Sequence, residues 1–277
     1  MLGNVGMKMN GIENFYKKLK RHEIIIGSHV HFDSCFVTEM IGGAGFDFIW
    51  IDGEHASQDT LDIQRHVLAC RAAGVASIVR APGGKLHLSK HILDMGADGI
   101  VFPMICTKED AEEAIGNCLY PPRGTRGFGT RRACNYGWDN KSEYLRDADN
   151  MIFKMVQIEH IDALRNLESI LDVDGISSIV IGPNDFATSM GYIGDPYSHE
   201  ETRSYLKKIV EITKARGIPV GASIGYNKTA MSFWLDNGVD WIGVGTDMDY
   251  IRSEARNALN DTIAMAKERG RVWTSNF

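Results

Sequence analysis

Two acidic residues of this chain, Glu159 and Asp185, each follow a short apolar run that is typical of a buried β-strand. The first run covers residues 154–158. The second covers 178–181 and is followed by a Gly-Pro turn before Asp185. Between them, leucine and isoleucine recur at helical spacing over residues 164–171. Parallel strands joined by a helix point the same way, so both carboxylates are expected at one edge of a sheet. In an α/β barrel this edge is where the chemistry is done.

The pairing of these two carboxylates suggests a site for a hard divalent cation. Mg²⁺ or Mn²⁺ often takes one or two protein carboxylates and leaves its other positions to water and substrate oxygens. Taken singly, Glu159 and Asp185 would each be interpreted as a solvated loop acid or a helix N-cap. Their equivalent positions after two neighbouring strands favour the functional interpretation, and the segments around them carry few cations.

Composition excludes several other classes of protein. The chain has 277 residues, a net charge of −6 and scattered basic residues, so neither a nucleic acid nor a membrane surface is expected as a partner. The five cysteines are widely spaced and form no CxxC pair, which indicates reduced thiols in a cytoplasmic protein. No apolar run approaches the roughly 20 residues of a membrane span. Residues 1–20 lack an apolar signal core and lead into an amphipathic helix.

The order of elements predicts a (β/α)₈ barrel. Eight short strand candidates alternate with helical segments, without a break in composition: 24–30, 46–51, 76–79, 99–102, 154–158, 178–181, 218–223 and 241–245. We expect a single domain over residues 1–277 with a core of about 24–268, a helix over 86–95, a long insertion over 120–150 and a long loop over 185–199. A doubly wound open sheet is the alternative, but no GxGxxG motif follows a strand to support it.

A barrel would bring a defined set of polar residues together at its strand ends. The set is Asp52, His55, Arg80, Gln157, Glu159, Asn184 and Asp185. Arg80 offers a planar fork that suits a carboxylate or enolate oxygen. His55 has a side-chain type that moves protons near neutral pH. Asp52 and Glu54 would be solvent-facing or supporting groups.

Other histidines allow two interpretations. His29 and His31 flank the end of the first strand, where they would either line the site or form a satisfied polar pair. His160 directly follows Glu159, and packing at a helix start is the simpler interpretation for it.

Seven segments of the chain resemble the HpcH/HpaI aldolase family, the metal-dependent (class II) pyruvate aldolases of the 4-hydroxy-2-oxoheptanedioate and 2-dehydro-3-deoxyglucarate aldolase type. They are GFDFIWIDGEH at 45–55, VR at 79–80, LDMGA at 93–97, VFPM at 101–104, YPPRGTRG at 120–127, VQIE at 156–159 and IGPND at 181–185. In this order and spacing they are highly specific, and the resemblance covers roughly residues 27–247.

The resemblance implies a fold, an assembly and roles for single residues. It implies a (β/α)₈ barrel of the phosphoenolpyruvate/pyruvate type that forms a homo-oligomer, a hexamer or a trimer, with the C-terminal helix exchanged between subunits. Glu159 and Asp185 would bind Mg²⁺, Mn²⁺ or Co²⁺, and Arg80 would hold the ketone or enolate oxygen. His55 would act as acid and base through a water, paired with Asp94 of its own or a neighbouring subunit. Substrate binding would fall to Gln157, Gly182, Asn184 and Asp185.

The implied activity is that of an aldehyde-lyase, which reversibly cleaves a 4-hydroxy-2-oxo acid into pyruvate and an aldehyde. A citrate or acyl-CoA lyase, or a Claisen-type condensing enzyme on the same barrel, is the rival activity, and a catalytically silent binding protein is the rival of another class. Two departures from the family pattern, Asn184 and the segment HVHFDSC at 29–35, lie near the acceptor side. They affect which aldehyde the protein is expected to use more than which reaction it is expected to catalyse.

Overall fold

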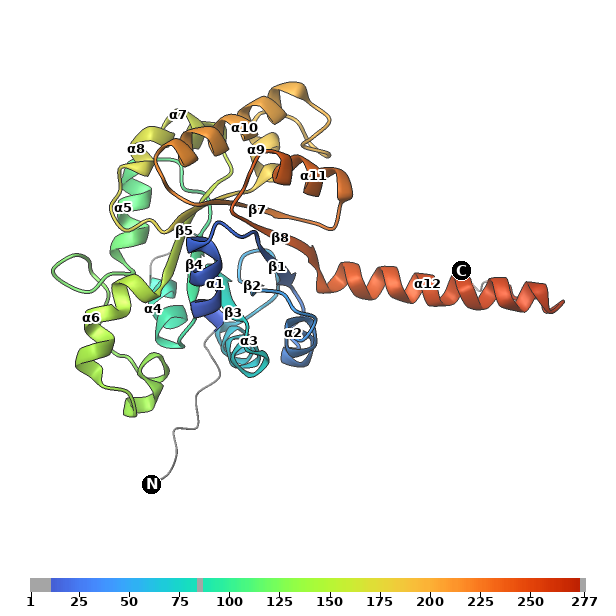
Figure 1. Cartoon of the computed structure of the whole chain (residues 1–277), viewed down its shortest axis with the longest axis horizontal. Coiled ribbons are helices and arrows are strands. Elements are labelled where there is room, and N and C mark those ends of the chain that lie inside the picture. The colour runs from blue at the N-terminus through green and yellow to red at the C-terminus, as the bar shows by residue number, and fades with distance from the viewer. Residues whose placement is uncertain (1–10, 84–86, 275–277) are drawn as a thin grey trace.

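A closed barrel of parallel strands forms the centre of the protein. The computed structural model describes residues 11–83 and 87–274 (Figure 1). Each strand pairs in parallel with the next, and β1 also pairs with β8, so that the sheet closes. The strands within the described residues are β1 (Ile25–Val30), β2 (Phe48–Asp52), β3 (Ala76–Arg80), β4 (Gly99–Phe102), β5 (Phe153–Ile158), β6 (Ser178–Ile181), β7 (Val220–Ile224) and β8 (Trp241–Thr246). The predicted (β/α)₈ barrel is confirmed.

Helices follow the strands and surround the sheet. They are α1 (Gly11–Lys20), α2 (Cys35–Gly42), α3 (Thr60–Ala73), α4 (His87–Asp94), α5 (Lys108–Gly116), η1 (Arg132–Gly137), α6 (Lys141–Met151), α7 (Ile161–Arg165), α8 (Leu167–Leu171), α9 (Pro183–Ser189), α10 (Glu200–Ala215), α11 (Lys228–Asp236) and α12 (Asp247–Glu268). The insertion expected over 120–150 contains η1 and most of α6. Residues 1–10 and the expected start of α4 at Leu86 lie outside the described residues.

Local signals explain why α3 has the bounds that its sequence predicts. The Asp59 side chain accepts hydrogen bonds from the backbone N–H groups of Leu61 and Asp62, and the Asp62 side chain accepts one from the Asp59 backbone N–H. This capping box satisfies N–H groups that a helix start leaves free. Gly74 ends the helix with φ of +77°, a left-handed conformation that favours glycine. The chain then turns directly into β3.

Aromatic side chains fill the inside of the barrel, and α1 covers its amino end. The Phe15 ring on α1 lies 5.9 Å from Phe48 and 4.8 Å from Phe153, measured between ring centroids. Trp241 projects into the barrel beside Gly221, where any Cβ would lie 2.0 Å from the indole. Its Nε1 donates to Ser178 Oγ at 2.9 Å, so the buried indole is satisfied. The amino end is thereby closed by packing, and the opposite end is left for polar groups.

The last helix, α12, runs straight away from the barrel (Figure 1). Of its residues only Asp247 is buried, and Ile251, Leu259 and Met265 expose apolar side chains. Across the described parts of the chain, none of the helices combines the length and apolarity that a membrane crossing requires. All five cysteines are described, and all are free thiols.

Candidate active site at the carboxyl ends of the strands

Arg80 is the last residue of β3 and is held by two carboxylates. Its Nε donates to Asp52 Oδ1 at 3.1 Å and its Nη2 donates to Asp52 Oδ2. Its Nη1 lies 3.0 Å from Glu54 Oε2. The guanidinium also lies over the Trp50 ring, 5.6 Å from the centroid. Arg80 is therefore buried and fixed in orientation, as its apolar strand predicts.

Asp52 is more central than its sequence position suggests. It ends β2 with a side chain that is 1% exposed. Its Oδ1 accepts from the backbone N–H groups of Glu54 and His55 at 2.9 and 3.1 Å, in addition to Arg80. Burial alone would raise the pKa of Asp52, but hydrogen bonds from His31 and Arg80 hold it far below its usual range. Of the two interpretations for Asp52, a solvent-facing or a supporting group, its burial fits the supporting one, because closing the barrel packs β2 against β1 and β3.

Glu159 directly follows β5 and is almost completely buried. Its Oε1 accepts from the backbone N–H of Met104 at 2.6 Å, and its Oε2 accepts from Gln157 Nε2. Met104 has φ of +55°, which is strained for a residue with a side chain. That conformation delivers its N–H to the carboxylate. The sequence holds Met104 within a family motif but gives no direct signal of this contact.

Gly182 has no side chain, and this allows the Glu159 and Gln157 side chains to lie against its backbone. A Cβ at Gly182 would lie 2.7 Å from Glu159 Oε2 and 2.8 Å from Gln157 Nε2. Gln157 Oε1 is buried and accepts no hydrogen bond from the described protein atoms. A buried acceptor without a partner is costly unless a bound group or a water satisfies it. Gln157 Oε1 is therefore an acceptor that remains for a group bound beside Glu159.

Asn184 and Asp185 lie in the first turn of α9 and are exposed. The expected long loop over 185–199 is therefore wrong in its first part. Pro183 at the first helical position favours helix here, because its fixed φ and missing N–H suit a helix start. Asp185 is close enough to Glu159 for its negative charge to act on that carboxyl.

Comparison with known proteins identifies the family. A model of the HpcH/HpaI aldolase/citrate lyase family matches residues 27–253. The chain belongs to this family. A hydroxypyruvate/pyruvate aldolase of Roseobacter denitrificans is 33% identical over 240 residues, which cover 86% of this chain and 92% of that protein. A 4-hydroxy-2-oxovalerate aldolase of Rhodococcus jostii is 35% identical over 242 residues, covering 85% and 90%.

A solved structure supports the same assignment. An HpcH/HpaI aldolase/citrate lyase family protein of Burkholderia cenocepacia superposes with a TM-score of 0.84 at 28% identity, covering 90% of this chain and 98% of that one. The resemblance in the sequence is confirmed, and with it the prediction of an aldolase at the level of the family.

In this aldolase-family protein, His55 and Asp94 do not contact each other within the chain. The His55 side chain is 59% exposed, and its Nε2 lies 3.7 Å from Glu54 Oε2. Asp94, the last residue of α4, instead accepts from Arg126 Nη2 at 3.1 Å. The expected His55–Asp94 pair therefore stays a prediction that involves a second subunit.

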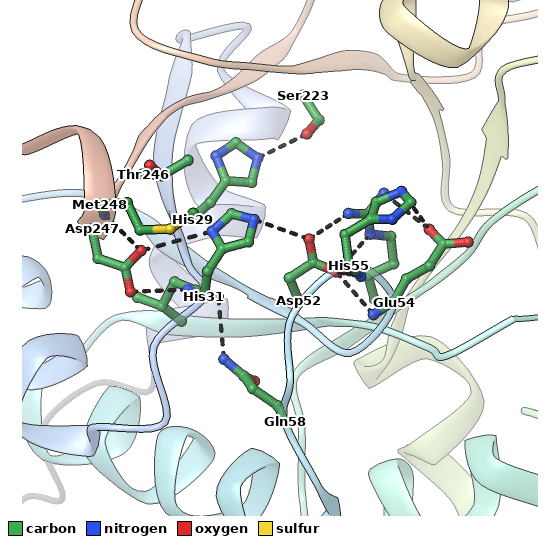
Figure 2. A network of polar contacts seen from close by, with 12 residues as sticks. His29, His31, Asp52, Glu54, His55, Gln58, Ser223, Thr246, Asp247 and Met248 are labelled. Atoms are coloured by element: carbon green, nitrogen blue, oxygen red, sulfur yellow. Dashed lines mark hydrogen bonds and ion pairs between the residues drawn. The ribbon is translucent and has the colours of Figure 1, made fainter.

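The two histidines of β1 and its loop have different roles. His29 Nδ1 must donate to the Gly245 carbonyl, at 2.8 Å, so its Nε2 accepts from Ser223 Oγ at 2.8 Å. Burial lowers the pKa of His29 to about 4, and the ring is neutral. His31 lies between Asp247 and Asp52, and these carboxylates raise its pKa to about 9 (Figure 2). Of the two interpretations given for these histidines, that of a hydrogen-bonded polar group fits His29. His160 caps the start of α7, as expected.

The charge of His31 predicts a pH-dependent stability. Its pKa is raised above the usual 6.5, so its contribution is fully present below about pH 6.5 and lost as pH rises through 9. We expect His31→Gln to lower the free energy of unfolding by about 2 kcal/mol at pH 6 and by much less at pH 10. Denaturant unfolding of both proteins from pH 6 to pH 10 measures this. A difference that grows with pH would contradict the charged state.

Negative charge at the site exceeds positive charge. The four carboxylates Asp52, Glu54, Glu159 and Asp185 outnumber the two cations of this region, Arg80 and the charged His31. Burial, with the negative charges of Glu54 and Asp185, raises the pKa of Glu159 to about 7. A cation beside Glu159 would stabilise its ionised form and lower this pKa. Carboxylate and amide oxygens are also the donors that Mg²⁺ and Mn²⁺ prefer.

The number of protein donors also suits such an ion. Among the described residues, no three His, Cys, Asp or Glu side chains are gathered into a metal cage. A Mg²⁺-type ion needs only one or two carboxylates, because water and substrate supply the rest. Glu159 and Asp185 therefore fit the expected metal.

Proposed function

We propose that this protein is a metal-dependent aldolase that reversibly cleaves a 4-hydroxy-2-oxo acid into pyruvate and an aldehyde. One observation carries the proposal: a buried, rigidly held Arg80 lies close enough to the buried Glu159 for their charges to interact, at the carboxyl ends of the barrel strands. One relative is named as a 4-hydroxy-2-oxovalerate aldolase and another as a hydroxypyruvate/pyruvate aldolase, which supports the proposal. Cleavage of such an acid leaves an enolate of pyruvate, and a fixed cation stabilises it.

Arg80 keeps donors for the reacting oxygen. A guanidinium has five N–H groups, of which Asp52 accepts two, from Nε and Nη2. Glu54 Oε2 lies 3.0 Å from Nη1 as an ion pair and accepts no hydrogen bond from the described residues. The N–H groups that remain on Nη1 and Nη2 can donate to the 2-oxo oxygen as negative charge develops there. Because Asp52 fixes the fork before substrate arrives, little reorganisation accompanies this stabilisation.

Glu159 and Asp185 are the residues that would hold the divalent cation. When bound, the ion supplies Lewis-acid activation of the 2-oxo acid. Gln157 is held against Glu159 through Nε2, which leaves Oε1 for a group in the site. Gly182 keeps the carboxylate and the amide uncrowded, and Asn184 follows it at the start of α9.

His55 is the proposed acid and base. Its exposed imidazole can take the proton of the substrate 4-hydroxyl through a water and return one to the enolate carbon. The turn that carries it is fixed because Asp52 Oδ1 accepts the His55 backbone N–H at 3.1 Å. We propose Asp94 of a neighbouring subunit as its partner.

A Schiff-base mechanism is disfavoured by the position of Lys154. This lysine lies at the amino end of β5, and its Nζ donates to the Ile152 carbonyl at 3.1 Å. A covalent mechanism would need a lysine amine at the carboxyl ends of the strands, where Glu159 lies.

Substitution Arg80→Lys tests the enolate role. A lysine keeps the charge but loses the fork, so we expect kcat/KM for pyruvate formation to fall by roughly 10²-fold or more. The loss should appear mainly in kcat, since the interaction strengthens in the transition state. Steady-state kinetics with saturating metal measure it, together with thermal unfolding. A near-normal rate in a stably folded variant would place Arg80 away from the reacting oxygen.

The rival activities predict other behaviour. A citrate or acyl-CoA lyase would act on a citryl or acyl thioester rather than on a 4-hydroxy-2-oxo acid. A silent binding protein would have no reason to bury Arg80, Asp52 and Glu159 at one site, because buried charges are costly where they serve no function. Pyruvate formation from a 4-hydroxy-2-oxo acid separates all three.

The aldehyde substrate that accepts pyruvate can be identified by measuring activity with a panel of aldehydes. Asn184 and the 29–35 segment lie where the family pattern is not kept. Pyruvate consumption with Mg²⁺, Mn²⁺ or Co²⁺ and aldehydes of different size and charge ranks the acceptors. Equal rates with every aldehyde would contradict an acceptor role for these residues.

We also propose that the protein is a homo-oligomer in which α12 packs against another copy. The apolar side chains of Ile251, Leu259 and Met265 are exposed on a helix that leaves its own barrel. Light scattering of the full chain should give a trimer or hexamer, and a monomer at micromolar concentration would contradict this assembly.

A further inference from the structure

Five charged side chains of alternating sign form a row at the mouth of the barrel, with Asp52 at its centre. His31 lies between Asp247 and Asp52 in this row (Figure 2). His31 Nδ1 lies 3.7 Å from Asp247 Oδ1, and His31 Nε2 lies 3.2 Å from Asp52 Oδ2. Arg80 follows on the other side of Asp52, and Arg80 Nη1 lies 3.0 Å from Glu54. The row connects the start of α12 and the ends of β1, β2 and β3.

The backbone holds His31 in this place. Asp247 Oδ2 accepts from the N–H groups of both His31 and Phe32 at 2.9 Å. Gln58 donates to the carbonyls of Val30 and Phe32 at 3.3 and 3.2 Å, which fixes the same turn from its other side. The imidazole therefore reaches Asp52 from a rigid support.

Asp52 connects His31 to both proposed catalytic groups. Its two oxygens hold the Arg80 fork, and its Oδ1 also holds the backbone of His55. Any shift of Asp52 would move the enolate-binding fork and the acid–base turn together. Arg80 also lies between two negative charges, Asp52 and Glu54, which weaken its attraction for an enolate. A cation on the far side of Asp52 offsets part of that effect.

We propose that His31 is a positioning residue that fixes Asp52 and, through Asp52, sets the orientation and effective charge of Arg80. This inference rests on the proposed function. The groups that face the His31 ring are Asp52, Asp247 and the neutral His29, whose ring centroid lies 6.4 Å away. The raised pKa of His31 agrees, since it keeps the ring charged at neutral pH.

A double-mutant cycle tests the route through Asp52. His31→Gln is expected to lower kcat for pyruvate formation by roughly 10–100-fold, with KM changed less, because a misplaced group mainly costs transition-state stabilisation. Asp52→Asn should cost more. The double variant should match Asp52→Asn alone, since two residues that act as one unit are not additive. His22→Gln, an exposed histidine after α1 at the barrel's amino end, should leave kcat unchanged.

Two kinetic results would overturn the proposal: full kcat in a folded His31→Gln protein, or losses that multiply in the double variant. If His31→Gln fails to fold, His31→Asn replaces it in the same cycle. A crystal structure of the variant gives a readout that does not depend on the reaction. Arg80 should have left its two-point contact with Asp52, and an unchanged contact would contradict the proposal even if the wild type released no pyruvate. Absent activity in the wild type alone would count against the proposed function only.

Discussion

Glu159→Gln is expected to abolish both metal binding and turnover. The amide is nearly the size of the carboxylate but carries no charge, so the site loses the buried anion that would hold the cation. Loss of Lewis-acid stabilisation, worth several kcal/mol, should lower kcat by about 10³-fold or more. Metal affinity by calorimetry and pyruvate formation at saturating metal measure the two effects on one preparation.

A matched pair of variants separates this role from a general effect of charge. Asp185→Asn should give the same double loss, since it removes the second proposed ligand. Glu168→Gln removes an equally negative charge from α8, where it contacts Arg216 on the surface, and should change neither property. A Glu159→Gln protein that binds metal and turns over normally would show that the cation lies elsewhere.

His55→Ala is expected to lower aldol cleavage by roughly 10²–10⁴-fold, the usual effect of a positioned acid–base group. Decarboxylation of oxaloacetate to the pyruvate enolate should suffer less, because that substrate has no hydroxyl proton to remove. His55 is exposed, so the substitution should leave the fold intact. Both rates are measured on one preparation with saturating metal, and thermal unfolding is the control.

Equal losses in both reactions would contradict the proton-transfer role. His55 would then position substrate or its water, and another base would be required. Glu54 is the next candidate, since burial raises its pKa and its Oε2 lies 3.7 Å from His55 Nε2. His29 is excluded as a base in this chain because both ring nitrogens are engaged.

The barrel and the edge that carries the candidate site could be predicted from the sequence because their signals are local. Short apolar runs, helical spacing and stop signals such as Gly74 fix each element, and parallel strands have only one common edge. The same signals predict the positions of Arg80 at the end of β3 and of Glu159 directly after β5.

The contacts that tune the site could not be predicted, because they join residues far apart in the chain. Asp247, whose side chain accepts from the His31 backbone N–H, is 216 positions away from His31 in the sequence. Met104 and Glu159, which also share a hydrogen bond, are 55 positions apart. Such pairs exist only after β8 closes on β1 and β4 pairs with β5. The left-handed backbone of Met104 is a further example, since the hydrogen bond from its N–H to Glu159 forms only in the folded barrel.

Pyruvate release by chelator-treated protein is the most direct test of a metal-dependent aldolase. The full chain is exhaustively treated with EDTA, dialysed, and supplied with a 4-hydroxy-2-oxo acid, with and without added Mg²⁺, Mn²⁺ or Co²⁺. We expect no pyruvate from the treated protein and recovery of the rate on addition of one or more of these ions. An undiminished rate after complete removal of metal would contradict the account.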